Sequence, residues 1–211
     1  MRGLCSLLLL APLSALAAEY AARVAEIAPT GAVHLAGWSV GGIIAQEMAV
    51  ALAAMGRKVG MVALLDSYPA DCWRAEPEPS PVAALRALLA IAGEDPDAHP
   101  KLTTRSAVVD HLRRTDTALG QLPERVLDGV IRTVTDTNRL VRTHFHRAMP
   151  GRLTHIRAGL DHAGRGLTAD LWTPWADRLD SVEVPFLHPQ MTGPDAVRLI
   201  APILADRMSA D

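Results

Sequence analysis

The chain has 211 residues, a length that suits one domain, and we expect a single domain over residues 1–211. Hydrophobic residues make up 49% of the sequence and charged residues 21%, so a sizeable core can form. A net charge of −2 without a basic run argues against nucleic acid as a partner. The two cysteines, Cys5 and Cys72, form neither a disulfide framework nor a zinc motif. We therefore expect no bound metal, and free thiols in the reducing cytoplasm.

The N-terminal stretch has two interpretations. Residues 1–17 combine one arginine, a short apolar run and a small-residue ending, which resembles a secretory signal peptide. The run is too short and too interrupted to span a membrane. Apolar residues also follow a helical repeat that continues past Ala17 to Ile27. We therefore favour a structural helix over residues 12–28 in a protein without a membrane partner.

The next segment places a serine between a strand and a helix. Residues 33–38 are apolar and rich in strand-forming residues, and residues 41–55 carry apolar residues at helical spacing. Between these two elements, the five residues from Gly37 to Gly41 read G-x-S-x-G. In a strand–turn–helix setting, this motif is typical of a nucleophile elbow.

Each of the five residues has an expected role in a nucleophile elbow. Ser39 is the candidate nucleophile, held in a tight and strained turn together with Trp38. We expect that Gly37 and Gly41 must lack side chains for the turn to close. The turn would also aim the N–H of Val40 at the oxyanion that forms during acyl transfer.

A buried strand and a long helical insertion follow. Residues 59–65 form a continuous apolar run, as expected of a strand covered on both faces of a parallel sheet, and Asp66 comes directly after them. Residues 67–80 are rich in proline and acidic residues and predict a loop. Residues 81–149 hold helical segments broken by glycine and proline, without a strand pattern. An insertion of this kind is typical of a lid, which we place at about residues 71–149.

The remaining residues complete an alternating pattern. We expect strands at residues 152–158 and 182–187, a short amphipathic segment that starts with residues 172–175, and a last helix over residues 193–208. Strands that alternate with helices predict an α/β fold, with a mostly parallel sheet, helices on both faces and the lid as an insertion.

Three residues with complementary chemistry come at equivalent places in this sheet. Ser39, Asp66 and His188 each follow a predicted strand, and the catalytic groups of such sheets lie at the carboxyl ends of the strands. The order serine, acid, histidine is that of an α/β-hydrolase. We expect His188 to take the proton of the Ser39 hydroxyl and Asp66 to orient the imidazole.

Other residues compete for these roles. Asp161 and His162 follow the strand after the lid and are the main alternatives to Asp66 and His188. Two further histidines lie in predicted strands, His34, which we expect to be structural, and His155. Four lie in the lid and are expected to face solvent or line the pocket: His99, His111, His144 and His146. Three aromatic residues are candidates to line the pocket, although packing is the favoured role for each: Trp73, Phe145 and Trp172.

The chain resembles the thioesterase domains that end nonribosomal peptide synthetases and some polyketide synthases, above all in GWSVGGIIAQEMAVALAAMGRKVGMVALLDSYP. In that family the acid follows the strand after the elbow in an LLD-S/T context, which Leu64 to Ser67 match. The catalytic histidine lies in H-x-x-M, which His188 to Met191 match. The resemblance covers about residues 12–205, is weakest in the lid, and favours Asp66 over Asp161.

The resemblance implies that an acyl or peptidyl chain passes from the phosphopantetheine arm of a carrier protein to Ser39. Water or an internal nucleophile then releases it as an acid or a macrocycle. The partner is a carrier protein, in cis or in trans, and the chain needs no cofactor, because phosphopantetheine arrives with the carrier. The alternatives are an esterase that acts on small free esters and an inactive remnant.

The chain departs from the family pattern at its start. Family members begin with a strand and a His-Pro-x-Gly-Gly type of loop, which supplies the second oxyanion N–H. Because we find no such segment, we expect the first strands to be missing and the activity to be impaired, by about 10²–10³ for one lost donor. Residues 4–11 are the candidate to cover the sheet edge that this would expose.

Overall fold

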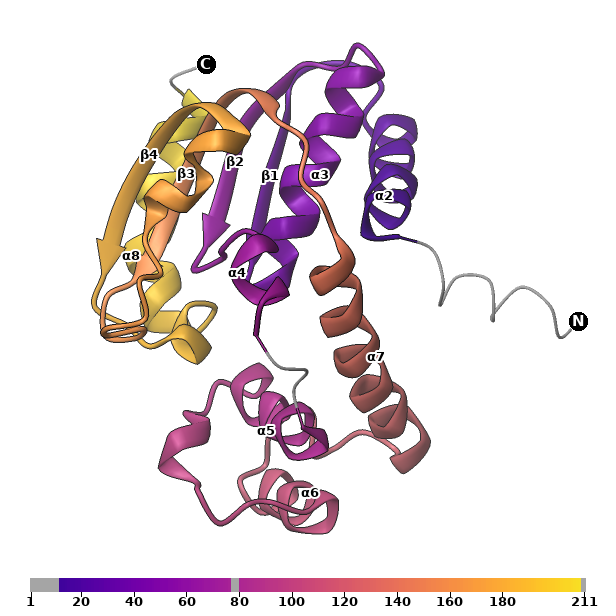
Figure 1. Ribbon diagram of the computed structural model, residues 1–211, viewed down its shortest axis with the longest axis vertical. Coiled ribbons are helices and arrows are strands. Elements are labelled where there is room, and N and C mark those ends of the chain that lie inside the picture. Colours follow the sequence, from indigo (N-terminus) through magenta and orange to yellow (C-terminus); the bar gives the residue numbers. More distant parts are fainter. Residues whose placement is uncertain (1–11, 77–79, 210–211) are drawn as a thin grey trace, which may run out of the picture.

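Four strands form one parallel sheet (Figure 1). The computed structural model describes residues 12–76 and 80–209. The strands are β1 (Val33–Trp38), β2 (Val59–Leu65), β3 (Met149–Ala158) and β4 (Ala176–Val184). They pair in the order β1-β2-β3-β4, and every neighbouring pair is parallel. The predicted α/β fold class is confirmed.

Helices cover both faces of the sheet. α2 (Leu13–Ile27) and α3 (Val40–Ala54) pack together on one face, and α8 (Pro194–Ser209) lies on the other (Figure 1). α3 is apolar around most of its circumference, because α2, the sheet and the lid enclose it. α2 runs without a break through Ala17, which it buries. Residues 4–11, the predicted cover of the sheet edge, lie outside the described residues.

The most deeply buried strand is β2. Its residues from Met61 to Leu64 are at most 6% exposed, since β1 and β3 flank the strand and helices cover both its faces. This position explains the continuous apolar run in the sequence. The apolar clusters on the two faces include, on the α3 side, Leu13, Ile43, Leu52 and Leu153, and on the α8 side, Ile156, Val184, Met191 and Ile200.

Two strand boundaries differ from the sequence-based prediction. β3 begins at Met149, three residues early, and β4 spans Ala176–Val184 instead of residues 182–187. β4 is an edge strand of the described sheet, so solvent-facing polar residues such as Glu183 alternate along it. A search for apolar runs therefore finds only the end of this strand.

The connection between β2 and β3 is mainly helical. Its helices are α4 (Asp71–Arg74), α5 (Pro81–Ile91), the 3₁₀ turn η1 (Pro96–Ala98), α6 (Arg105–Arg114) and α7 (Glu124–Thr143). The side chains of Ser80 and Thr104 accept backbone N–H groups at the starts of α5 and α6. The expectation of helix up to residue 149 is wrong for residues 144–148, which contacts with α3 hold in an extended conformation.

The helices α5, α6 and α7 lie together, with α5 and α6 away from the sheet (Figure 1). Their side chains form a hydrophobic cluster that is distinct from those of the sheet. Its buried members are Leu88, Leu89, Val108, Val109, Leu112 and Leu127. The insertion is therefore held together by its own apolar side chains, and α7 leads from it back to the sheet.

Cys72 is a free, half-buried thiol, and burial together with the neighbouring Asp71 raises its pKa. Cys5 lies outside the described residues. Within the described ranges, none of the helices has the length and the apolar character needed to cross a bilayer.

The separate cluster predicts separate stability. Leu112→Ala removes a fully buried side chain of the insertion and is expected to cost about 2–5 kcal/mol of local stability. Hydrogen exchange should then accelerate in α5 and α6 while β2 stays protected. The matched control is Ile156→Ala, which should loosen the sheet instead. Equal loosening of β2 by both variants would contradict two separate clusters.

Candidate active site

A sharp turn between β1 and α3 carries Ser39. The residue has φ 55° and ψ −127°, a strained backbone conformation for a residue with a side chain. Its N–H donates to the Leu65 carbonyl at 3.0 Å, and its own carbonyl accepts the N–H of Gly42 at 3.0 Å. These two bonds hold the turn against the end of β2. Val40 is the first residue of α3, where a backbone N–H has no acceptor within the helix.

Close packing explains two of the three glycines around the turn. A Cβ on Gly37 would lie 2.1 Å from the Gly41 carbonyl oxygen, and a Cβ on Gly42 would lie 2.5 Å from the Ser67 side chain. A Cβ on Gly41 would meet no atom within 4 Å. The expectation that Gly41 must lack a side chain is therefore wrong, and Gly42 is the second glycine that the packing requires.

Three side chains form a hydrogen-bonded line at the carboxyl edge of the sheet. His188 Nε2 lies 3.2 Å from Ser39 Oγ, and His188 Nδ1 lies 2.6 Å from Asp66 Oδ2. These distances fit a nucleophile, a base and an orienting acid. The Asp66 side chain is fully buried, whereas that of His188 is 22% exposed. The imidazole can therefore meet a substrate while the acid stays out of water.

Both oxygens of the Asp66 carboxylate are hydrogen-bonded. Oδ1 accepts the Tyr68 hydroxyl at 3.0 Å and the Ala158 N–H at 3.1 Å, and Oδ2 lies near His188 and, at 2.7 Å, near His162 Nε2. Burial alone would raise the pKa of Asp66, but the hydrogen bonds from His162 and His188 outweigh it and hold this pKa well below its usual value. Burial and the Asp66 charge raise the pKa of Tyr68, so its hydroxyl stays a donor.

The two competing residues lie beside this line and not within it. Asp161 Oδ2 accepts the backbone N–H of His188 at 3.0 Å, whereas the ring of His188 contacts Asp66. His162 contacts Asp66, as given above, and lines the same cavity as Ser39. Sequence reasoning missed Tyr68 and treated His162 as a rival base. The signal for both was their place at the carboxyl ends of β2 and β3.

The elbow also holds the loop of the histidine. His188 does not end a strand, as expected, but begins a 3₁₀ turn, η3 (His188–Gln190), four residues after β4. The Trp38 indole N–H donates to the His188 carbonyl at 3.0 Å, and the two rings pack with centroids 5.1 Å apart. Met191, three residues further, is fully buried and anchors the other end of the turn.

The line of three side chains opens into a cavity of about 910 Å³. One face of α7 forms much of its wall, through residues that recur at helical spacing: Val126, Gly129, Val130, Thr133, Val134, Thr137, Asn138 and Val141. Trp73 also lines the cavity. Trp172 is fully buried and donates its N–H to the Ser67 carbonyl at 2.7 Å, and Phe145 is exposed beneath the Arg74 guanidinium. Of the three candidate aromatics, Trp73 is the one that lines the cavity.

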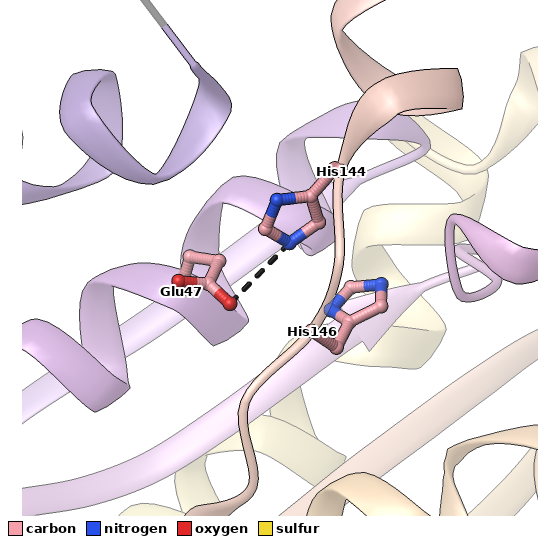
Figure 2. A group of neighbouring side chains, drawn as sticks. All are labelled: Glu47, His144 and His146. Atoms are coloured by element: carbon pink, nitrogen blue, oxygen red, sulfur yellow. Dashed lines mark ion pairs between the residues drawn. The ribbon is translucent and has the colours of Figure 1, made fainter.

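Two histidines expected to face solvent or the pocket are buried elsewhere. Figure 2 shows His144 and His146 on the segment after α7, next to Glu47 of α3. His144 Nε2 lies 3.3 Å from Glu47 Oε1, and burial lowers the pKa of His146 to about 4. His146 Nδ1 bonds Gln46 Oε1 and its Nε2 accepts the Ala70 N–H, both at 2.9 Å. These contacts tie the end of the insertion to α3.

Among the residues that the structure describes, two clusters of histidine and carboxylate lie away from Ser39, and neither has the form of a vacant metal site. In the first, the Arg147 guanidinium lies 2.9 Å from Glu47 Oε2, and both ring nitrogens of His146 already have partners. In the second, His99 Nε2 and His111 Nε2 lie 3.1 and 2.6 Å from the same oxygen of Glu94. Such distances fit N–H donors that share one acceptor. The contacts join α6 to the turns that follow α5 and η1.

The histidines within strands have structural contacts. His34 Nδ1 accepts the Met61 N–H at 3.0 Å, and its ring covers Gly60, where a Cβ would lie 2.5 Å away. His155 is fully buried with Nε2 3.0 Å from the Ser67 carbonyl, and burial lowers its pKa to about 4.

Comparison with known proteins points to one family of domains. The sequence profile of the Thioesterase domain matches residues 6–203. The chain is 28% identical over 196 residues to the Dimodular nonribosomal peptide synthase of Bacillus subtilis (strain 168), an alignment that covers 92% of the chain and 8% of that protein. It is 26% identical over 194 residues to the Malpinin synthetase of Mortierella alpina, covering 90% of the chain and 2% of that protein. The chain thus spans a small part of the length of these relatives.

Solved structures share the fold. The NocB thioesterase domain, in covalent complex with a fluorophosphonate nocardicin G analog, matches with a TM-score of 0.65 at 23% identity, over 94% of this chain and 75% of that one. The thioesterase domain SrfTE, described for the cyclization of the lipopeptide antibiotic surfactin, matches with a TM-score of 0.63 at 18% identity, over 90% and 73% of the two chains. Because the profile match extends over most of its length, the chain belongs to the Thioesterase domain family.

Proposed function

We propose that the chain is a serine thioesterase that accepts an acyl or peptidyl chain from a carrier-protein phosphopantetheine onto Ser39 and releases it by hydrolysis or cyclisation. One observation carries this proposal: the hydrogen-bonded line from Ser39 through His188 to Asp66 lies at the wall of a large cavity. Membership of the Thioesterase domain family supports the thioester as the bond that is broken.

The proposed reaction has two acyl transfers. His188 Nε2 takes the proton of Ser39 as its oxygen attacks the thioester carbonyl, and the Val40 N–H stabilises the oxyanion. The C–S bond breaks, and the departing thiolate takes the proton from His188. Water, or a nucleophile of the bound chain, then gives its proton to His188 and attacks the ester carbonyl. The C–O bond to Ser39 breaks, and His188 returns the proton to the Ser39 oxygen. Asp66 stabilises the imidazolium in both steps.

The cavity and the relatives support the class of substrate and partner. The walls of the cavity are mostly apolar side chains and threonines, so they suit an extended acyl chain better than a small polar ester. The Bacillus subtilis relative named above is a dimodular nonribosomal peptide synthase, and a solved four-domain nonribosomal peptide synthetase contains a region of the same fold. We therefore propose an acyl or peptidyl carrier protein as the partner, in the same polypeptide or in another.

A covalent probe tests the nucleophile. A fluorophosphonate should add once to the purified chain, and Ser39→Ala should abolish the adduct, because only an activated serine reacts. Intact-mass spectrometry measures the result. A folded chain that stays unlabelled would contradict the proposed function and would fit the inactive remnant. A labelled chain that turns over aryl esters but no acyl-pantetheine thioester would favour the esterase instead.

A pair of isosteric variants tests the acid. Asp66→Asn should lower kcat by about 10⁴, because the amide cannot hold the productive imidazole tautomer. Asp161→Asn should cost less than about tenfold, because Asp161 contacts the backbone N–H of His188 and not its ring. Steady-state kinetics on an acyl-pantetheine thioester compares the two variants. The reverse order of losses would show that Asp161 is the acid.

A third variant tests the cavity as the acyl site. Gly129 borders the cavity from the N-terminal part of α7, and a Cβ there would have no heavy atom outside the helix backbone closer than 3.9 Å. Gly129→Leu should suit the helix and fill part of the cavity, lowering kcat/KM for long acyl thioesters about tenfold and leaving acetyl thioesters unaffected. Thr135→Leu, on an exposed part of α7, is the matched control. Equal effects on long and short chains would argue against the acyl site.

A further inference from the structure

Two histidine rings share one oxygen of the Asp66 carboxylate. His188 Nδ1 lies 2.6 Å and His162 Nε2 lies 2.7 Å from Oδ2. An ionised carboxylate only accepts hydrogen bonds, so both of these nitrogens carry a proton. The mechanism proposed above uses the contact with His188 and gives the contact with His162 no role.

A second carboxylate flanks the other side of the His162 ring. Its Nδ1 is buried, lacks a hydrogen-bond partner among the described residues, and lies 3.5 Å from Asp161 Oδ1. A neutral ring that is protonated at Nε2 turns the lone pair of Nδ1 toward this carboxylate. An imidazolium turns an N–H toward it instead. The charged ring thus has a carboxylate at each nitrogen, with Asp66 on one side and Asp161 on the other.

The backbone of His162 adopts a strained conformation that holds its ring between the two carboxylates. The residue has φ 63°, in the left-handed region that side chains rarely adopt. Asp161 Oδ1 accepts the backbone N–H of His162 at 2.8 Å, and Tyr68 packs edge-on against the ring with centroids 5.4 Å apart. The side chain is only 10% exposed. Strain of this kind, next to the candidate acid, points to a role in the reaction.

We propose that His162 is a positioning residue that acts on His188 through the shared Asp66 oxygen and sets the lower pH limit of Ser39 activation. The inference rests on the function proposed above for Ser39, His188 and Asp66. His162 fixes the carboxylate and competes with His188 for its negative charge. Its role is indirect, since Asp66 is the group that it contacts.

The direction of the effect follows from electrostatics. The ring centroids of His162 and His188 are 5.8 Å apart, so a proton on His162 opposes a proton on His188 and also withdraws charge from Oδ2. His188 must be neutral to accept the Ser39 proton. A charged His162 therefore keeps His188 available as a base at lower pH.

The groups around His162 come from four segments of the chain. The charged and titratable groups that face or influence it are Asp66, Tyr68, His155, Asp161 and His188, with Arg165 in the same turn. The Arg165 guanidinium lies over the Trp73 ring, with its other contact at Glu76. The two carboxylates are thus the neighbours in hydrogen-bond or ion-pair contact with the His162 ring.

The test compares His162→Gln and His162→Ala with the wild-type full chain. The readout is the rate of fluorophosphonate labelling of Ser39 from about pH 5 to about pH 9. Glutamine keeps an N–H donor for Asp66 but cannot gain a proton, and alanine loses both properties. At low pH the labelling rate should fall as the pH decreases, which gives the profile an acidic limb. We expect this limb to move to higher pH by about one unit in both variants. Above the limb, the rate should fall about tenfold in the alanine variant and less in the glutamine variant.

Two further variants complete the comparison. Asp161→Asn keeps both rings but removes the charge beside His162 Nδ1, so the acidic limb should move up by a smaller amount. It covers the case in which the His162 variants do not fold. His99→Gln, in the insertion, removes a histidine without touching Asp66 and should leave the limb in place.

An NMR titration of histidine Cε1–H resonances gives a readout that needs no activity, with His188→Gln assigning the His188 signal. The midpoint for His188 should rise by about one pH unit in His162→Gln. If neither this midpoint nor the acidic limb moves in folded variants, the proposal is overturned and His162 only packs against Asp66. The two proposals can also be told apart. If the His188 midpoint rises in His162→Gln but the fluorophosphonate does not label the wild-type chain, the coupling is supported and the proposed function is contradicted.

Discussion

The buried carboxylate of Asp66 is the constraint on which the rest of the site depends. A carboxylate without solvent is costly unless donors surround it, and Asp66 receives them from Tyr68, Ala158, His162 and His188. These donors come from the ends of β2 and β3 and from the loop after β4. The charge is compensated only when all of these segments are in register, so the same network that positions the acid also makes the correct fold a condition of its stability.

A second contact joins the elbow that carries the serine to the turn that carries the histidine. Trp38 precedes Ser39 in the elbow, and its indole N–H and ring hold the turn that begins at His188. Residues that are 150 positions apart in the sequence are thereby fixed in one rigid arrangement. The distance between Oγ and Nε2 therefore depends on the packing of an elbow residue that is neither nucleophile nor base.

Periodicity predicted the fold because most elements bury an apolar stripe or run. The continuous run of β2 and the strand–turn–helix around Ser39 are such signals. The start of β4 was not predicted, because polar residues recur along an edge strand and make its sequence resemble that of a loop. The roles of Gly42 and His162 were not predicted for another reason. Each role depends on a contact between residues far apart in the sequence, and local sequence patterns do not reveal such a contact. Residue types at strand ends indicated where the chemistry lies, but not how the hydrogen bonds are shared.

The hydrophobic cluster of α5, α6 and α7 is physically separate from the network around Asp66. Substitutions that reshape the wall of the cavity on α7 need not disturb the carboxylate, and changes near the carboxylate need not alter the wall. Under selection, the wall of the cavity and the network around Asp66 can therefore diverge at different rates within one gene. Mutations that reshape the cavity have a ready place in a segment whose folding is largely its own.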